Sequence, residues 1–174
     1  MKQKFICILL ILFSVTAKAN LFVERIVEDD FSNVKEEITL AIEGQGLVIA
    51  HHSDVAIMLN RTAKDLAQQA FSTMTNILPI KLTKNQPTQG TYQHGVVIEF
   101  CSASLSAETT AADVNNILLC PFSVAIYQLN GEPNQVHVSY LRLSKFADED
   151  NLKSVIALTQ VEDMLAEIVA EALD

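Results

Sequence analysis

The sequence predicts an α+β fold, a two-layer sandwich of about five short strands with helices packed on one face, ferredoxin-like in outline. Segments that alternate apolar and polar residues are interspersed with segments whose apolar residues recur every three or four positions. The segment "NGEPN" at 130–134 separates two alternating runs, which is typical of a β-hairpin. The order strand, helix, strand, helical excursion, strand, second excursion, hairpin, helix fits two packed layers.

The first half of the chain reads as strand, helix, strand and helix. Residues 22–27 alternate as a short strand, and residues 32–43 have helical spacing that ends at Gly44 and Gly46. The run "GLVIAHH" at 46–52 predicts a second strand, which we expect to be parallel to the first, with a right-handed crossover. Residues 54–78 again show helical spacing.

The second half begins with a polar segment, 81–95, which contains one Pro and two Gly and is predicted to be a loop. A short strand is expected at 96–100, and a helix at 104–112 capped by Ser104 or Ser106. The strands of the predicted hairpin are 121–129 and 135–143. A helical stripe from about 151 to the end is expected to pack across the sheet.

The N-terminal segment has the pattern of a secretory signal peptide. Lys2 and Lys4 precede an apolar run at 5–15, and the small-x-small triplet 17–19 predicts cleavage after Ala19. The run of 11 residues is shorter than the roughly 20 that a membrane-spanning helix needs. We therefore expect a secreted protein, periplasmic in a bacterial source, without a stable membrane anchor.

The remaining residues, 20–174, have a length typical of a single domain. They carry 9 Lys and Arg against 21 Asp and Glu, a net charge of −12. Because such a surface repels phosphate backbones and anionic lipids, nucleic acid is excluded as an expected partner.

Cleavage would leave two cysteines, Cys101 and Cys120, in an oxidising compartment, where a disulfide is the favoured interpretation. Closing a loop of about 20 residues would stabilise the fold by roughly 3 kcal/mol. The two strands that the cysteines flank must then be antiparallel, or Cys101 must lie beyond its strand, because parallel neighbours would hold the sulfurs too far apart. Metal ligation and thiol redox chemistry remain as alternatives.

The metal alternative would recruit His51, His52 or His94 as ligands. His51 and His52 are adjacent on a predicted strand, so their side chains are expected on opposite faces and at most one of them can join a given site. No pair has the spacing of a zinc motif. The sequence also lacks a nucleophile elbow or another catalytic constellation, so it assigns no enzyme activity and no cofactor.

Several stretches resemble domain of unknown function family 302, in the longer exported variant with paired cysteines. The similarity covers 31–142, and its most specific parts are "FCSA" at 100–103, "CP" at 120–121 and "GEP" at 131–133. Relatives have glycines around the Lys-Asp pair, where this chain has Ala63 and Ala67, which favours a continuous helix. The resemblance implies a small α+β domain and supplies no catalytic residues.

Two functions are consistent with these features. The first is an exported binding or accessory protein that holds a small ligand or a partner protein without catalysis. A concave apolar pocket would support it, whereas a tight cluster of His, Glu and Ser around a cleft would indicate chemistry. The second is a periplasmic metal-binding or thiol-redox accessory protein. A homodimer formed through an exposed sheet edge is compatible with either.

Overall fold

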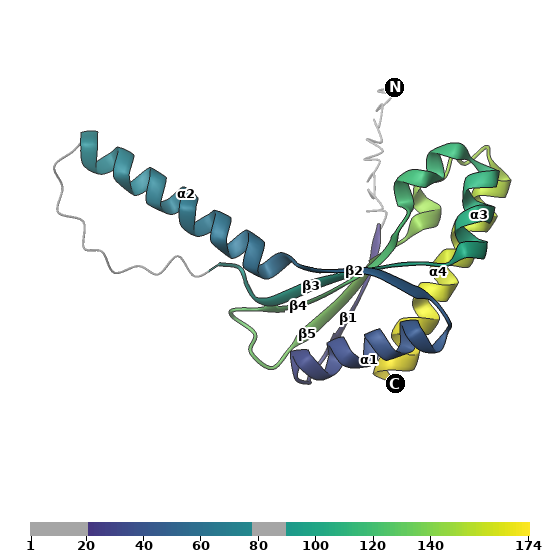
Figure 1. The fold of residues 1–174 in the computed structure, drawn as a ribbon, viewed down its shortest axis with the longest axis horizontal. Helices are drawn as coiled ribbons and strands as arrows, with labels where there is room; N and C mark the ends of the chain where they lie inside the picture. The colour runs from purple at the N-terminus through teal and green to yellow at the C-terminus, as the bar shows by residue number, and fades with distance from the viewer. Residues whose placement is uncertain (1–20, 78–89) are drawn as a thin grey trace, which may run out of the picture.

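The architecture is a five-stranded antiparallel sheet with helices packed on it (Figure 1), in the computed structural model, which describes residues 21–77 and 90–174. The strands are β1 (Phe22–Val27), β2 (Val48–Asp54), β3 (Tyr92–Cys101), β4 (Phe122–Leu129) and β5 (Val136–Leu141). The helices are α1 (Phe31–Gly44), α2 (Val55–Ile77), α3 (Ala103–Ala112) and α4 (Leu152–Leu173), with short 3-10 helices η1 (Val114–Leu119) and η2 (Leu143–Phe146).

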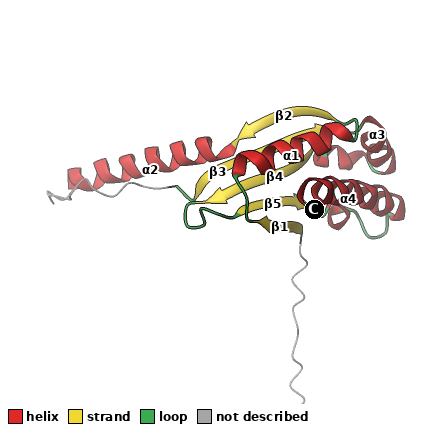
Figure 2. Cartoon of the chain, turned by 90° about the horizontal axis from the view of Figure 1, so that it is seen from below, coloured by secondary structure: helices red, strands yellow, loops and turns green. Residues whose placement is uncertain are grey.

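Helices α1 and α4 lie side by side across one face of the sheet (Figure 2), and the predicted two-layer α+β sandwich is thereby confirmed. Each strand alternates between this covered face and the opposite one. In β4, for example, Phe122, Val124 and Ile126 are buried while the residues between them are half-buried. The predicted hairpin of β4 and β5 is also confirmed, with Ala125 opposite Ser139.

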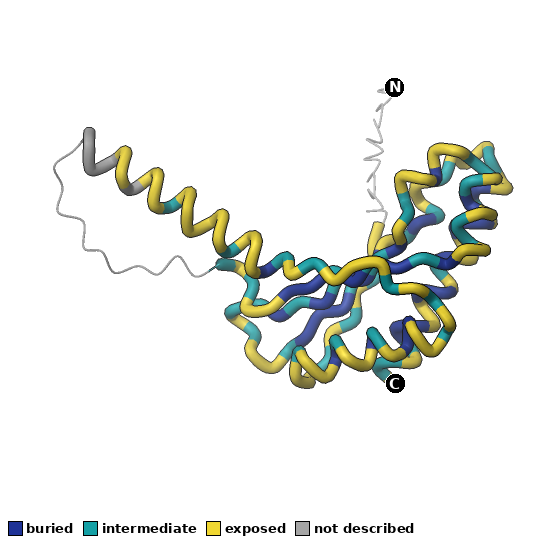
Figure 3. Tube along the Cα trace, viewed as in Figure 1, coloured by how far each residue is buried: buried dark blue, intermediate teal, exposed yellow. Residues whose placement is uncertain are grey.

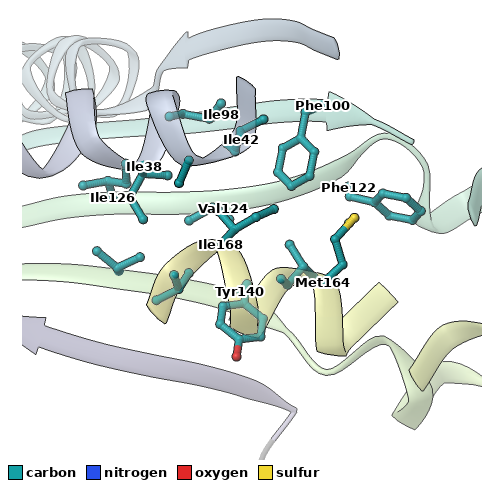
Figure 4. Packing of buried hydrophobic residues seen from close by; sticks show 14 of the residues in the cluster. Ile38, Ile42, Ile98, Phe100, Phe122, Val124, Ile126, Tyr140, Met164 and Ile168 are labelled. Atoms are coloured by element: carbon teal, nitrogen blue, oxygen red, sulfur yellow. The ribbon is translucent and has the colours of Figure 1, made fainter. Parts of the chain in front are cut away.

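The core lies between the covered face and the two helices (Figure 4). The sheet contributes Ile98, Phe100 and Phe122 among others, and all three are almost fully removed from water. Each such side chain stabilises the fold by roughly 1.5–3 kcal/mol through burial of its apolar surface. The helices supply the matching stripe, Val34, Ile38 and Ile42 from α1 and Leu158, Val161, Leu165 and Ile168 from α4.

The opening strand, helix, strand unit differs from its prediction. Strands β1 and β2 run in the same direction, but they form the two edges of the sheet, in the order β1-β5-β4-β3-β2. Strands β3, β4 and β5, which come later in the chain, occupy the space between them. Helix α1 therefore packs over β4, β3 and β2, beside α4, instead of bridging two neighbouring strands. The helix ends where Gly46 adopts a left-handed backbone, φ 73°, as expected from its glycines.

Helix α2 is continuous and extends away from the sheet (Figure 1). It begins directly after β2, and only its first turns approach β3. Most of its residues from Arg61 to Ala70 are exposed (Figure 3). The following strand, β3, begins at Tyr92, four residues earlier than the sequence predicted, so the end of the predicted loop is strand.

The second excursion, α3 and η1, is fixed to α4 by buried polar contacts. The Asn116 side chain donates to the carbonyl oxygen of Thr109 at 2.9 Å and to the Ser154 hydroxyl at 2.9 Å. The start of α3 is capped by Ser102, which accepts from the Leu105 amide at 3.4 Å, and not by Ser104 or Ser106 as predicted. The N-cap residue differs from the prediction because α3 begins at Ala103, one residue earlier than expected.

The predicted signal peptide, residues 1–19, lies outside the described residues. None of the helices within 21–77 and 90–174 is long and apolar enough to cross a membrane. The single-domain assignment of residues 20–174 remains a prediction.

Candidate functional site

The two cysteines lie near each other at the base of the second excursion. Cys101 is the last residue of β3 and Cys120 immediately precedes the cis peptide bond to Pro121 at the start of β4. Strands β3 and β4 are antiparallel, with Phe100 opposite Phe122, which is the topology that a disulfide requires. The structure holds both residues as half-buried free thiols, so the disulfide itself stays a prediction.

The surroundings of this pair do not favour redox chemistry. Burial raises the pKa of the Cys101 thiol, and the neighbouring Cys120 raises it further by repulsion between the sulfurs and by hydrogen bonding. The Ser106 hydroxyl lies 3.5 Å from the sulfur of Cys120. Redox-active cysteines normally have a lowered pKa from a cationic neighbour or a helix N-terminus. Cys101 directly precedes Ser102, the N-cap of α3, but burial and the neighbouring Cys120 leave the pKa of its thiol raised.

The structure separates one of the three candidate histidines from the other two. His51 pairs with Glu99 and His52 with Ile98, so the two side chains lie on opposite faces of β2, as the sequence predicted. His94 stacks on Phe31 of α1, with ring centroids 5.0 Å apart.

His52 and His94 line a common groove of about 380 Å³ between α1, β2 and the start of α2. Asp54, Lys35 and Asn60 complete its polar lining. Within the described part of the chain, no three His, Cys, Asp or Glu side chains converge in a way that could hold a metal ion. The metal alternative remains a prediction without a ligand set among these residues.

The face of the sheet opposite α1 and α4, here called the open face, has no helix lying across it in the described chain (Figures 1 and 2). It consists of the strand residues that alternate with the core. From β1 to β2 these include Phe22, Glu24, Ile26, His137, Ser139, Leu141, Ala125, Tyr127, Val97, Glu99 and His51. The open face is therefore mixed in character, with apolar and polar side chains side by side.

A concave apolar pocket, here called the face pocket, lies where α2 leaves the open face. Its volume is about 190 Å³. The walls come from three elements, Val55, Ala56 and Leu59 of α2, Tyr92, Gly95, Val96 and Val97 of β3, and Ala125, Ile126 and Tyr127 of β4. Almost all of the lining is carbon, so the pocket favours an apolar group.

Local contacts at the start of α2 shape this pocket. Asp54 accepts from the Ile57 amide at 3.0 Å and caps the helix, while the Asn60 side chain donates to the carbonyl oxygen of Tyr92 at 2.8 Å. Gly95 allows the helix to approach β3, because a Cβ there would already lie 3.4 Å from the Cβ of Ala56. A larger side chain at this position would occupy the space between helix and strand.

A polar network borders the face pocket. The Tyr127 hydroxyl donates to Glu24 Oε1 at 2.6 Å, and the same carboxylate oxygen lies 3.1 Å from His137 Nδ1. The other ring nitrogen, Nε2, lies 3.0 Å from Glu132 Oε2. Tyr127 stacks on His137 with ring centroids 4.8 Å apart, and Tyr92 meets Tyr127 edge to face at 5.7 Å. The network therefore fixes the aromatic wall of the pocket.

The electrostatics of the network hold Glu24 as a carboxylate and Tyr127 as a neutral phenol. The hydrogen bond from Tyr127 lowers the pKa of Glu24, and the contact with His137 lowers it further, against the opposing effect of burial. Burial raises the pKa of Tyr127, and its bond to Glu24 adds to that effect. Both His137 contacts are hydrogen bonds at once only when the ring carries a proton on each nitrogen.

This cluster contains a His and two Glu, and each ring nitrogen of the His lies beside a carboxylate. Both nitrogens of His137 face carboxylates, and its side chain is only 8% exposed. The Ser139 hydroxyl on the same face makes no hydrogen bond to the imidazole. A general base needs a nitrogen directed at a substrate or nucleophile. Of the hydrogen-bonded residues in this described network, Tyr127 lines the face pocket, whereas Glu24, Glu132 and His137 do not.

Sequence reasoning did not identify this network. Glu24 and His137 are separated by 113 positions and meet only because β1 pairs with β5. That pairing has no local signal. The contact between Glu132 and His137 is local in sequence, because Glu132 lies in the turn "NGEPN", five residues before His137. The hairpin pattern could therefore have indicated it.

A larger groove of about 650 Å³ lies between α1 and the end of α4. Its polar lining is acidic, Glu28, Asp29, Glu37, Glu171 and Asp174. Such a cluster of carboxylates is unsuited to an apolar ligand and has the character of a solvated surface.

Comparison with known proteins gives a family match and a shared fold. The family model described as domain of unknown function DUF302 matches residues 52–172. A solved structure, an uncharacterized conserved protein DUF302 from Bacillus stearothermophilus, is 14% identical with a TM-score of 0.59, and the match covers 88% of this chain and 99% of that one. No curated protein matches the chain. At this identity the structural likeness shows the fold alone.

Proposed function

The chain belongs to the family of domain of unknown function DUF302, and we propose that it acts as an exported binding protein that holds an apolar group without changing it chemically. The group is either a small ligand or one side chain of a partner protein. The observation that carries this proposal is the face pocket, a concave apolar site bordered by one fixed polar network.

The size of the pocket limits what it can hold. Its volume of about 190 Å³ is below the roughly 300–1,000 Å³ of sites that enclose a whole drug-sized ligand. It is similar to the roughly 150 Å³ cavity that accommodates a benzene ring in an engineered protein. The pocket therefore suits one aromatic ring or one branched aliphatic group, with the remainder of a larger ligand lying on the open face.

The rim of the pocket favours a group with a polar end. Tyr127 presents its ring to the pocket and its hydroxyl to Glu24. Glu24 lies outside the pocket lining, so a donor meets its carboxylate only from a part of the ligand that extends beyond the buried ring. An aromatic donor is therefore preferred to an anionic ligand, because Glu24 and Glu132 repel negative charge.

Export is part of the proposal, and it is supported by the sequence pattern of residues 1–19. N-terminal sequencing of the protein recovered outside the cytoplasm tests it directly. Asn20 should be the first residue. A chain that still begins at Met1 would contradict export by a cleaved signal.

Indole is a suitable probe, because the chain contains no Trp and indole fluorescence can be followed without interference from the protein. Titration of the purified protein into indole should raise the fluorescence anisotropy with a dissociation constant on the order of 1 mM, as expected for so small a ligand. Ala125 lies in the pocket, and Ala125→Phe would fill it. We expect this variant to weaken binding at least about tenfold.

The matched control is Ser123→Phe, which adds the same ring on the same face of β4 but outside the pocket lining. It should bind indole like the wild type. Equal binding by the wild type and Ala125→Phe would overturn the proposal, as would loss of binding in the control alone.

A further inference from the structure

The groove lined by His52 and His94, here called the His52 and His94 groove, lies on the covered face of the sheet beside its edge strand β2. His52 and Asp54 are two positions apart on β2 and share one face of it. Their partners across the ladder are Ile98 and Val96, which both belong to the core under α1. The groove is therefore on the opposite side of the sheet from the polar network.

Helix α1 supplies another wall of this groove. Phe31 and Lys35 both line it, and they share one side of the helix because they lie four positions apart. The ring of Phe31 stacks on that of His94, with ring centroids 5.0 Å apart, which holds the start of α1 against the start of β3. Lys35 is half-buried at this wall. Part of its side chain is therefore removed from water while its charge stays next to the groove.

The groove contains one cation and one anion that are not paired with each other. Within the residues that the structure describes, Lys35 makes no ion pair, although the chain has 21 Asp and Glu. Asp54 uses its Oδ1 atom to accept the Ile57 amide at the start of α2. Among the described contacts, its second oxygen, Oδ2, has no partner. A ligand that carries both charges would supply an oppositely charged partner to each of these groups.

The size and the remaining lining of the groove suit a whole small molecule. Its volume of about 380 Å³ falls within the roughly 300–1,000 Å³ of sites that enclose a small ligand. The groove also has an apolar part, formed by Phe31, Ala56, Ile57 and Val96. A purely anionic ligand would meet the carboxylate of Asp54, and a purely cationic one would meet the ammonium of Lys35. The lining therefore favours a zwitterion with an apolar portion.

From these observations we propose that the His52 and His94 groove binds a free amino acid with an apolar side chain. The ligand carboxylate pairs with Lys35, its ammonium pairs with Asp54 Oδ2, and its side chain lies against Phe31 and Val96. The imidazoles of His52 and His94 add groups that can donate or accept further hydrogen bonds. This second site does not rest on the function proposed for the face pocket, because it recognises charge at both ends of its ligand.

Isothermal titration calorimetry with L-leucine tests the ligand class. The wild type should bind it with a dissociation constant on the order of 0.1 mM. Isocaproate lacks the ammonium of leucine and isoamylamine lacks its carboxylate, and each should bind at least about tenfold more weakly because one charged hydrogen bond is lost. If L-leucine does not bind, or if either analogue binds as tightly as L-leucine, the proposal is wrong.

Two substitutions test the charged groups. Lys35→Met keeps the apolar stem of the side chain, and Asp54→Asn keeps an oxygen that can cap α2. Each should weaken L-leucine binding at least about tenfold. The controls make the same two changes at neighbouring exposed residues of α2, as Lys64→Met and Asp65→Asn, outside the groove. They should bind like the wild type. Unchanged binding by both groove variants would overturn the proposal, as would equal loss in the controls.

The two sites are distinguished by Ala125→Phe. Ala125 lines the face pocket and not the His52 and His94 groove, so this variant should bind L-leucine like the wild type. Loss of L-leucine binding in Ala125→Phe with normal binding in Lys35→Met would place the amino acid in the face pocket and contradict the proposal. Circular dichroism verifies that each variant is folded, and indole binding is read independently.

Discussion

At the scale of single residues, Glu24 connects parts of the molecule that are far apart in sequence. It accepts the Tyr127 hydroxyl at 2.6 Å and lies 3.1 Å from His137 Nδ1. These bonds strengthen as the carboxylate becomes charged, which is why its pKa is lowered. The same bonds hold the aromatic wall of the face pocket in place.

The lowered pKa of Glu24 predicts a pH dependence of stability. An unfolded glutamate titrates at about 4.3, and the native pKa lies below its ordinary value. The unfolded chain therefore binds more protons in this range, so the contribution of Glu24 is present above about pH 5 and disappears as the pH falls through the native pKa. Glu24→Gln should reduce the free energy of unfolding by about 1 kcal/mol at neutral pH.

Urea unfolding of wild type and Glu24→Gln between about pH 3 and 7 measures this effect. The difference between the two proteins should shrink toward the acidic end. Glu36→Gln, an exposed change on α1, serves as the control and should show no such convergence. A difference that grows on acidification would contradict the assignment of Glu24.

The cysteine pair carries a second prediction at this scale. Protein recovered from an oxidising compartment should be about 2 Da lighter than the dithiol form and resist alkylation until it is reduced. Reduction should then cost roughly 3 kcal/mol of stability, because the closed loop no longer restricts the unfolded chain. Two thiols that alkylate at once in the folded protein would exclude the disulfide.

At the scale of elements, most helices and strands could be predicted from local sequence patterns. The β4–β5 hairpin follows from its turn residues, and α4 from an uninterrupted apolar stripe. The positions of β1 and β2 at opposite edges did not follow, because strand order depends on pairings between distant segments. The missed contacts of Glu24 have the same origin, since they exist only where β1 meets β5.

The hydrogen bonds of Asn116, which connect the second excursion to α4, give a further prediction. Asn116 is 6% exposed and Ser154 is fully buried. Asn116→Leu would leave the Ser154 hydroxyl and the Thr109 carbonyl without this donor, which should cost about 1–3 kcal/mol. Amide hydrogen exchange should increase first in α3. Asn115→Leu, the same change at an exposed neighbour, should leave stability within about 0.5 kcal/mol of wild type.

At the scale of the whole molecule, the two faces of the sheet differ in how they are covered. The covered face forms the core with α1 and α4, and the open face carries the face pocket and the polar network. The sequence predicted the layers because burial imposes a period on each element. It could not predict the pocket, whose walls come from three elements brought together only by the fold.

The most direct test of the proposed binding site is an amide chemical-shift map recorded while indole is titrated into the isotope-labelled protein. Shifts should concentrate at Ala56, Gly95, Val97 and Ala125, which line the face pocket. They should disappear in Ala125→Phe. Shifts confined to the His52 and His94 groove or to the acidic groove between α1 and α4, or no shifts at all, would contradict the claim that the open face holds an apolar group.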